Sequence, residues 1–147
     1  MWNHEKDRGN PHPEIDPKIN SRAIDELPLI FCLVCAKAKG ISYAKNLGEL
    51  RHKEQDRLKF ILKFLKMVGI KVIEKNNNLK IYGNPNLKLN GSYIVKNFMK
   101  DHRAFMLACI AALTLGGKKW VVHDIDSINT SFPNFIKLLK SLGAKIS

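Results

Sequence analysis

The sequence lacks an apolar run long enough to cross a membrane, and it has few residues that could cross-link a fold. A spanning helix needs about 20 consecutive apolar residues, whereas the longest run, residues 27–36, has a charged residue directly before and after it. The three cysteines are an odd number placed in apolar segments, which argues against a disulfide framework and suits a reducing cytoplasm. The first 14 residues contain no apolar stretch, so we expect no signal peptide.

Metal ligands and acidic residues are also sparse. The five histidines are scattered without metal-ligand spacing, so we expect no metal site. Only 13 residues are acidic against 25 basic ones, which gives a net charge of +12. Of the basic residues, 20 are lysines spread along the chain. This charge fits either an anionic partner or lysines that merely cover the surface.

What the sequence has is enough apolar material for a core. The chain has 147 residues, of which 45% are hydrophobic, and this excludes a disordered tail. Cys32 and Cys35 form a C-x-x-C pattern, but they lie inside an apolar helical stretch. We therefore expect them to pack in the core rather than to carry redox chemistry.

Two segments of the chain repeat one plan. Asp25 and Asp101 each stand 15 residues before a glycine, and a second glycine follows 44 residues after Asp25 and 42 residues after Asp101. Glycines at these positions are typical of helix C-termini. The four are Gly40, Gly69, Gly116 and Gly143.

Each copy is predicted to contain two helices. The first, over residues 27–38 and again over 104–115, is apolar on nearly every face and should be buried. The second helix is one-sided, with apolar residues at i, i+3, i+4 and i+7. These residues are Leu58, Ile61, Leu62 and Leu65 in one copy, and Phe132, Phe135, Ile136 and Leu139 in the other.

Strands are predicted between and after these helices. A hairpin is expected around three asparagines, residues 76–78. The predicted strands cover residues 41–45, 71–74, 79–82, 120–123 and 144–146. The fold class is therefore α/β (α+β), with two consecutive βαβαββ-type repeat units over about residues 23–98 and 99–147. Residues 1–22, polar and rich in proline, are expected to form an irregular leader.

The helix starts carry recognisable capping residues. Asp25, Asp101 and Ser131 are predicted N-caps, because their side-chain oxygens can accept hydrogen bonds from free backbone N–H groups. Pro28 and Pro133 should lie just inside their helices, where proline is tolerated.

Basic residues gather at the same helix starts. Arg103 follows the Asp101 cap, and Arg51, Lys53 and Arg57 precede or begin the helix that carries Leu58, with only Glu54 to relieve them. A helix N-terminus prefers acids, so this clustering makes physical sense if an anion binds there. The other reading is a solvated charged turn, which the charge pattern alone favours.

Four motifs in the chain resemble 5-enolpyruvylshikimate-3-phosphate (EPSP) synthase, in the order and at about the spacing of that family. They are Asp25-Glu26-Leu27-Pro28, Leu50-Arg51-His52-Lys53-Glu54-Gln55-Asp56-Arg57, Asp101-His102-Arg103 and Ser131-Phe132-Pro133-Asn134-Phe135. The resemblance covers the chain from about residue 15 to its end. It implies a fold of six βαβαββ units in two lobes, of which this chain matches about the last two, an incomplete enolpyruvyl transferase lobe.

The resemblance also implies a reaction. The family transfers an enolpyruvyl group from phosphoenolpyruvate to the 5-hydroxyl of shikimate 3-phosphate and releases phosphate, a step of aromatic amino acid biosynthesis. It needs no metal or organic cofactor. Asp25 matches the catalytic carboxylate that takes the hydroxyl proton. Glu54 matches the catalytic acid that handles the methylene proton.

Other positions match substrate-binding residues of the family. Lys53 matches a lysine that contacts the phosphate of shikimate 3-phosphate, with Glu49 nearby. Arg57 and Arg103 match a pair that clamps phosphoenolpyruvate, a role that suits bidentate guanidinium groups. His102 is expected to line the same site.

Two departures from the family affect activity. Thr130 stands at a substrate-binding position where many members have a lysine that contacts phosphoenolpyruvate. The other lobe, which supplies further contacts, has no counterpart in this chain. Catalysis in the family depends on closing both lobes around the substrates. We therefore expect the chain alone to be weak or inactive, and a separate chain could supply the missing lobe.

Two other functions stay open on the sequence. One is a related enolpyruvyl transferase that acts on UDP-N-acetylglucosamine, although the Lys-Glu-x-Asp-Arg run and the Ser-Phe-Pro-x-Phe motif favour the shikimate branch. The other is a basic nucleic-acid-binding module, which predicts clustered arginines and exposed aromatic residues on strands.

Overall fold

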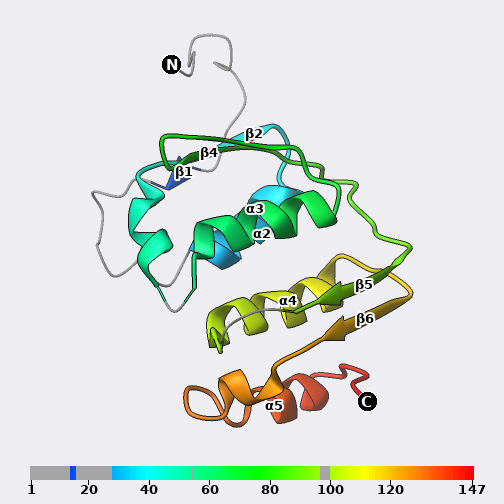
Figure 1. Cartoon of the computed structure of the whole chain (residues 1–147). Coiled ribbons are helices and arrows are strands. Elements are labelled where there is room, and N and C mark those ends of the chain that lie inside the picture. The colour runs from blue at the N-terminus through cyan, green and yellow to red at the C-terminus, as the bar shows by residue number, and fades with distance from the viewer. Residues whose placement is uncertain (1–13, 16–27, 54, 97–99) are drawn as a thin grey trace. The chain divides into compact units, whose positions relative to one another are not determined.

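The structure, a computed structural model, describes residues 14–15, 28–53, 55–96 and 100–147. It divides into two compact units, Met1–Leu87 and Lys88–Ser147. The chain combines helices with strands, as the predicted α/β (α+β) class requires (Figure 1). The elements are β1 (Glu14–Ile15), α2 (Pro28–Lys37), β2 (Ile41–Ala44), the 3-10 helix η2 (Leu47–His52), α3 (Arg57–Met67), β3 (Val72–Lys75), β4 (Asn78–Tyr82), β5 (Ser92–Val95), α4 (His102–Thr114), β6 (Lys119–Val122), the 3-10 helix η3 (Ile125–Ile128) and α5 (Phe135–Ser141).

The first unit is a four-stranded sheet covered on one face by two helices. The strands lie in the order β1-β2-β4-β3, with β1 and β2 parallel and the other pairs antiparallel. Leu79 and Ile81 of β4 are fully buried, whereas Lys80 between them is not. This alternation follows from the period of two in a strand. One face of the sheet therefore packs against α2 and α3 (Figure 1).

The two helices of this unit differ in pattern, as the sequence predicts. Most described side chains of α2 are buried, although Ile30 and Val34 are exposed. In α3, apolar residues of one side enter the core while the lysines between them stay at the surface. Leu58, Ile61 and Leu65 are almost completely buried. A 3.6-residue period thus places α3 between the sheet and solvent.

The predicted hairpin is confirmed. Strands β3 and β4 pair antiparallel, with Lys75 opposite Asn78. Asn76 and Asn77 form the connection with φ values of 52° and 58°. Two successive left-handed residues are the requirement of a type I′ turn, and asparagine adopts them more readily than most residues.

The chain after β4 passes close to the end of α2. The backbone N–H of Asn84 donates to the carbonyl oxygen of Ala36 at 2.8 Å. At Gly83 a Cβ atom would collide with the carbonyl oxygens of Cys35 and Ala38. Only glycine allows this approach, and the contact gives the last carbonyls of the helix hydrogen-bond partners.

The second unit combines a two-stranded sheet with two helices. Strands β5 and β6 pair in parallel, and α4 contacts both β6 and η3. The rings of Tyr93 and Trp120 stack across the strands at 4.8 Å between centroids. Phe105 of α4 and Phe135 of α5 meet edge to face at 6.5 Å. One aromatic contact thus links the two strands of the unit, and the other links its two helices.

Both units turn at left-handed residues in the same order. A glycine follows the first helix, an asparagine or aspartate follows the strand, and a glycine follows the second helix. Their φ values are 90° at Gly40, 57° at Asn46 and 80° at Gly69, and 81° at Gly116, 60° at Asp124 and 96° at Gly143. The predicted helix-ending glycines are therefore confirmed.

The end of the chain departs from the prediction in two ways. Ser131 is not an N-cap and Pro133 is not inside a helix, because α5 begins only at Phe135, after Asn134. The backbone N–H groups of Ser131 and Phe132 instead donate to Ile128, which extends the turn after η3. The predicted strand over residues 144–146 is also wrong: Ala144 donates its N–H back to Leu139, and residues 144–147 form no strand.

The division into units differs from the predicted repeat boundary near residue 98. The compact units meet between Leu87 and Lys88, because β5 pairs with β6 and so belongs to the second unit. The repeat boundary itself stays a prediction. Within the predicted leader, Glu14–Ile15 forms β1, and the rest of residues 1–22 lies outside the described residues. Over the described residues, every helix is too short or too polar to cross a membrane.

Candidate functional site

A 3-10 helix carries the first candidate binding residues. η2 buries Leu47 and Leu50 and leaves Glu49 exposed. It is entered through Asn46, which has a left-handed backbone and whose N–H donates to the side-chain Oδ1 of Asn78 at 2.8 Å. The N–H of Leu47 donates to the carbonyl of Asn77 at 2.9 Å. Two hydrogen bonds, one to a side-chain oxygen and one to a backbone carbonyl, thus hold η2 against the β3–β4 hairpin.

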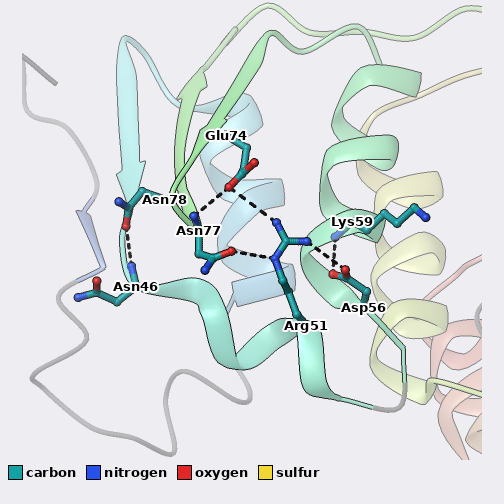
Figure 2. A network of polar contacts seen from close by, with 7 residues as sticks. All are labelled: Asn46, Arg51, Asp56, Lys59, Glu74, Asn77 and Asn78. Carbon is teal, nitrogen blue, oxygen red and sulfur yellow. Dashed lines mark hydrogen bonds and ion pairs between the residues drawn. The ribbon is translucent and has the colours of Figure 1, made fainter. Parts of the chain in front are cut away.

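Arg51 connects three elements through its guanidinium group. Figure 2 shows it between the hairpin and the start of α3. Its Nε donates to Oδ1 of Asn77 at 2.8 Å, one terminal nitrogen donates to Oδ2 of Asp56 at 3.0 Å, and the other lies 3.7 Å from Glu74. The N–H of Asn77 also donates to Glu74 at 2.8 Å. Arg51 therefore acts as a structural tie rather than as a free cation of the cluster.

Asp56 is the N-cap of α3. Its Oδ1 accepts the backbone N–H of Lys59 at 2.9 Å while its other oxygen accepts from Arg51 (Figure 2). The sequence analysis missed the role of Asp56, because it named only Glu54 as an acid that offsets the charges of Arg51, Lys53 and Arg57. An aspartate directly before an apolar run of helical period was the signal that could have identified it. The roles of Glu74 and Asn77 had no local signal, because they depend on where the hairpin folds.

Lys53 and Arg57 do not lie on one continuous helix. Lys53 ends η2 with an extended backbone (φ −84°, ψ −170°), and α3 begins at Arg57. Lys53 and Arg57 are therefore not neighbours on one helical face, contrary to what their i, i+4 spacing suggests. Glu54 and Asp25, the two predicted catalytic residues, lie outside the described residues.

Arg57 is buried at the first position of α3. Its exposed fraction is 2%, which is rare for an arginine and requires hydrogen-bonding surroundings. Gln55 is also buried, and its side-chain Nε2 has no hydrogen-bond partner in the described part of the chain. An unsatisfied buried donor is costly. The side-chain Nε2 of Gln55 is thus a buried donor, two residues before Arg57, that an anion could satisfy.

The second unit presents a comparable helix start. Asp101 is fully buried and caps α4, its Oδ1 accepting the N–H groups of Arg103 at 3.0 Å and Ala104 at 3.3 Å. The predicted cap at Asp101 is confirmed. His102 and Arg103 are the first two residues of α4 and are half-buried. Thr130 lies exposed in the turn after η3.

Neither of these helices has an acid in its first turn. α3 begins with Arg57, and α4 begins with His102 and Arg103, with no acidic residue in either first turn. The N-cap carboxylates of Asp56 and Asp101 offset part of the repulsion between these cations and the partial positive charge of each helix N-terminus. A bound phosphate or carboxylate would fit the same two helix starts.

The cysteines are placed as the sequence predicts. Cys32 and Cys35 are buried in α2, with exposed fractions of 2% and 0%. Burial raises the pKa of Cys35 to about 11 and that of Cys32 still further above its usual range. Such thiols stay protonated and are poor nucleophiles near neutral pH. Among the described residues, no group of three or more His, Cys, Asp or Glu could hold a metal ion.

Comparison with known proteins identifies close relatives of the chain. Residues 5–139 match the family described as EPSP synthase (3-phosphoshikimate 1-carboxyvinyltransferase). The 3-phosphoshikimate 1-carboxyvinyltransferase of Magnetococcus marinus is 39% identical over 133 residues, and that of Geobacter metallireducens is 38% identical over 132. Each match covers 90% of this chain and 29% of the relative.

Solved structures show the same fold. An EPSP synthase from Acinetobacter baumannii superposes with a TM-score of 0.72 at 25% identity and covers 92% of this chain and 31% of that one. The enolpyruvyl transferase NikO from Streptomyces tendae superposes with a TM-score of 0.59 at 22% identity and covers 81% of this chain. The chain thus spans less than a third of the length of the relatives it matches. By its sequence match and its fold, this chain belongs to the EPSP synthase family.

Proposed function

We propose that this chain forms part of the substrate site of a 3-phosphoshikimate 1-carboxyvinyltransferase, which moves an enolpyruvyl group from phosphoenolpyruvate to shikimate 3-phosphate and releases phosphate. The observation that carries the proposal is the placement of Arg57, His102 and Arg103 in the first turns of α3 and α4 without an acid in either turn. Such cations fit ligands that carry phosphate and carboxylate groups.

The proposed roles follow the matched motifs. Arg57 and Arg103 bind phosphoenolpyruvate, and His102 lines the same site. Lys53, at the end of η2, binds the phosphate of shikimate 3-phosphate beside Glu49. Asp25 takes the proton of the attacking hydroxyl and Glu54 handles the methylene proton.

Thr130 lacks the charge that a lysine would offer to phosphoenolpyruvate at this position. We propose that its hydroxyl group still lines the site, and that the chain binds this substrate more weakly than members with a lysine there. An exposed position after η3 would accept the longer lysine side chain without repacking a core.

The chain needs a second lobe for this reaction. Because it spans about 29% of its relatives, we propose that a separate chain supplies the missing lobe in the cytoplasm and that this chain alone is weak or inactive. Closing two lobes orients substrates and excludes water, and both effects contribute to rate.

The test is a chimera in which this chain replaces the matching segment of the Magnetococcus marinus relative. Phosphate release from phosphoenolpyruvate is measured with and without shikimate 3-phosphate. We expect release that depends on both substrates. The Arg103→Lys variant should lose about 10- to 100-fold in kcat/KM, since a lysine cannot replace a bidentate guanidinium.

A control variant distinguishes loss of a substrate contact from a general effect of removing a positive charge. Lys137→Gln, at an exposed position of α5, should leave phosphate release unchanged. A folded chimera that releases no phosphate, or that prefers UDP-N-acetylglucosamine as acceptor, would contradict the proposal. So would salt-dependent binding of the chain to random DNA that shikimate 3-phosphate does not affect.

A further inference from the structure

Asn90 and Gly91 form the only asparagine–glycine pair in the sequence. They connect Leu89, which bridges to Gly116, with Ser92, where β5 begins beside β6 (Figure 1). An asparagine side chain can react with the backbone nitrogen of the residue that follows it. Glycine permits this reaction most readily, because it has no Cβ to restrict the approach to that nitrogen.

The surroundings leave both reacting groups accessible. Asn90 is exposed and Gly91 is half-buried. Among the described residues, the side chain of Asn90 and the N–H of Gly91 have no hydrogen-bond partner. By contrast, the N–H of Leu89 donates to Leu115 at 2.8 Å, and the carbonyl oxygen of Gly91 accepts the N–H of Lys118, also at 2.8 Å. The backbone is thus held on both sides, while the side chain of Asn90 can turn toward the Gly91 nitrogen.

The other described asparagines lack this combination. Asn84 precedes a proline, whose nitrogen carries no hydrogen. Asn77 precedes another asparagine, and its side-chain oxygen accepts a hydrogen bond from Arg51. Asn129 precedes Thr130, whose branched side chain crowds its own backbone nitrogen. The rest precede residues with larger side chains than glycine.

We propose that Asn90 is a site of spontaneous deamidation, which converts it into a mixture of aspartate and isoaspartate. The nitrogen of Gly91 gives its proton to hydroxide and attacks the side-chain carbon Cγ of Asn90. The new C–N bond closes a succinimide ring, and the side-chain nitrogen takes a proton from water and leaves as ammonia. A water molecule then opens the ring at either carbonyl. No electrons are transferred, and the inference does not depend on the proposed reaction.

Basic residues lie close to this turn. Lys88, Lys118 and Lys119 are all exposed. Lys118 donates its backbone N–H to Gly91, and Lys119 pairs with Ser92 across the two strands. Nearby positive charge stabilises a deprotonated group. It therefore favours the reactive form of the Gly91 nitrogen, and it also favours the carboxylate product.

The two products differ in their effect on the sheet. Isoaspartate lengthens the backbone by a carbon atom, because the chain then runs through the former side chain. This extra atom falls between Leu89, held to Leu115, and Gly91, held to Lys118. It should break the hydrogen bond to Lys118 and loosen the start of the β5–β6 pair. Aspartate keeps the backbone and changes only the charge.

The test is incubation of the full folded chain at mildly alkaline pH, with peptide mapping by mass spectrometry. We expect Asn90 to react first and to yield isoaspartate, which direct hydrolysis of the amide cannot produce. Gly91→Ala should slow the reaction about tenfold, because a Cβ shields the nitrogen. That Cβ would lie 3.2 Å from the hydroxyl of Tyr93, the end of a side chain that can move. Gly48→Ala is the matched control, since Gly48 follows a leucine, and it should leave the rate at Asn90 unchanged.

Amide hydrogen exchange of the aged chain gives a second measurement. The amide of Lys118 should exchange about tenfold faster in the isoaspartate form than in the Asn90→Asp variant. Equal exchange in the two would overturn the loosening of β5. Deamidation of another asparagine first, aspartate without isoaspartate, or an unchanged rate in Gly91→Ala would overturn the site. So would a folded chain that keeps Asn90 intact while the urea-unfolded chain reacts, because the folded turn would then prevent ring closure.

Discussion

Single capping residues stabilise the two helix N-termini that carry basic side chains. Asp56 and Asp101 both cap helices whose first turns hold cations, and each accepts backbone N–H groups through its side chain. The Asp101 cap was predictable because an aspartate stands shortly before the apolar run over residues 104–115. The predicted cap at Ser131 is wrong, because the carbonyl oxygen of Ile128 accepts the N–H groups of Ser131 and Phe132 and the helix begins only at Phe135. Whether these N–H groups bind a side-chain oxygen or a backbone carbonyl depends on how η3 packs. That packing cannot be read from the few residues around Ser131.

Asp101→Ala should lower the free energy of unfolding by about 1–2 kcal/mol, because α4 loses an N-cap that accepts two N–H groups in a buried place. Asp101→Asn keeps an acceptor oxygen and should cost less. Urea unfolding followed by circular dichroism measures both. An equal loss in the two variants would show that the carboxylate charge, and not capping, stabilises the helix start.

Arg51→Gln should lower the free energy of unfolding by about 1 kcal/mol, because a half-exposed guanidinium loses its contacts with Asn77 and Asp56. Lys59→Gln is the matched control, since only the backbone of Lys59 enters this network. Urea unfolding of both variants checks the difference. A loss no larger than that of the control would mean that the network in Figure 2 contributes nothing measurable.

The thiols of Cys35, which is buried, and Cys109, which is half-buried, should make stability depend on alkaline pH. Burial raises the pKa of Cys35 and Cys109 to about 11 from an ordinary value of 9.0. Between these values the folded chain holds protons that the unfolded chain has released, so the free energy of unfolding falls as pH rises. Below pH 9.0 this contribution is complete.

Unfolding by urea between pH about 8 and about 11 measures this slope. Replacing Cys35 and Cys109 with alanine should flatten it, whatever the variant does to stability at neutral pH. Since lysines and tyrosines titrate in the same range in both proteins, the difference between the slopes isolates the thiols. Identical slopes would contradict the raised pKa values of these two thiols.

At the scale of elements, local pattern predicted most helices and strands. The left-handed asparagines between β3 and β4 and the glycines after the helices were readable, because each reflects a conformation that few residues adopt. The strand expected at residues 144–146 failed, since a strand needs a neighbour and Ala144 donates its N–H to the end of α5. The close passage of the chain at Gly83 was also hidden, because it joins segments far apart in sequence.

Gly83→Ala should lower the free energy of unfolding by about 2 kcal/mol or more, because a Cβ there would meet the carbonyl oxygens of Cys35 and Ala38 and force the backbone apart. Gly69→Ala is an instructive comparison, since Gly69 has open space around it but a left-handed φ of 80°. Thermal unfolding of the two variants ranks them. A loss at Gly83 smaller than the loss at Gly69 would contradict the tight approach.

At the scale of the whole chain, the repeat and the four motifs carried the prediction of family, and the match over residues 5–139 confirms it. The candidate site was predictable only in part. The motifs named Arg57, His102 and Arg103, and the structure puts them in the first turns of two helices. The resemblance predicted that further contacts come from a second lobe, and the chain spans about 29% of its relatives, so these contacts lie outside the structure.

The most direct test of the anion site is a titration of the full chain with phosphoenolpyruvate, followed residue by residue through backbone amide NMR signals. We expect saturable shifts at the first turns of α3 and α4, around Arg57 and Arg103, with much smaller shifts from sulfate at the same ionic strength. Shifts spread over the surface lysines, equal for phosphoenolpyruvate and sulfate and abolished by salt, would show that the helix starts bind no specific anion and would contradict the account.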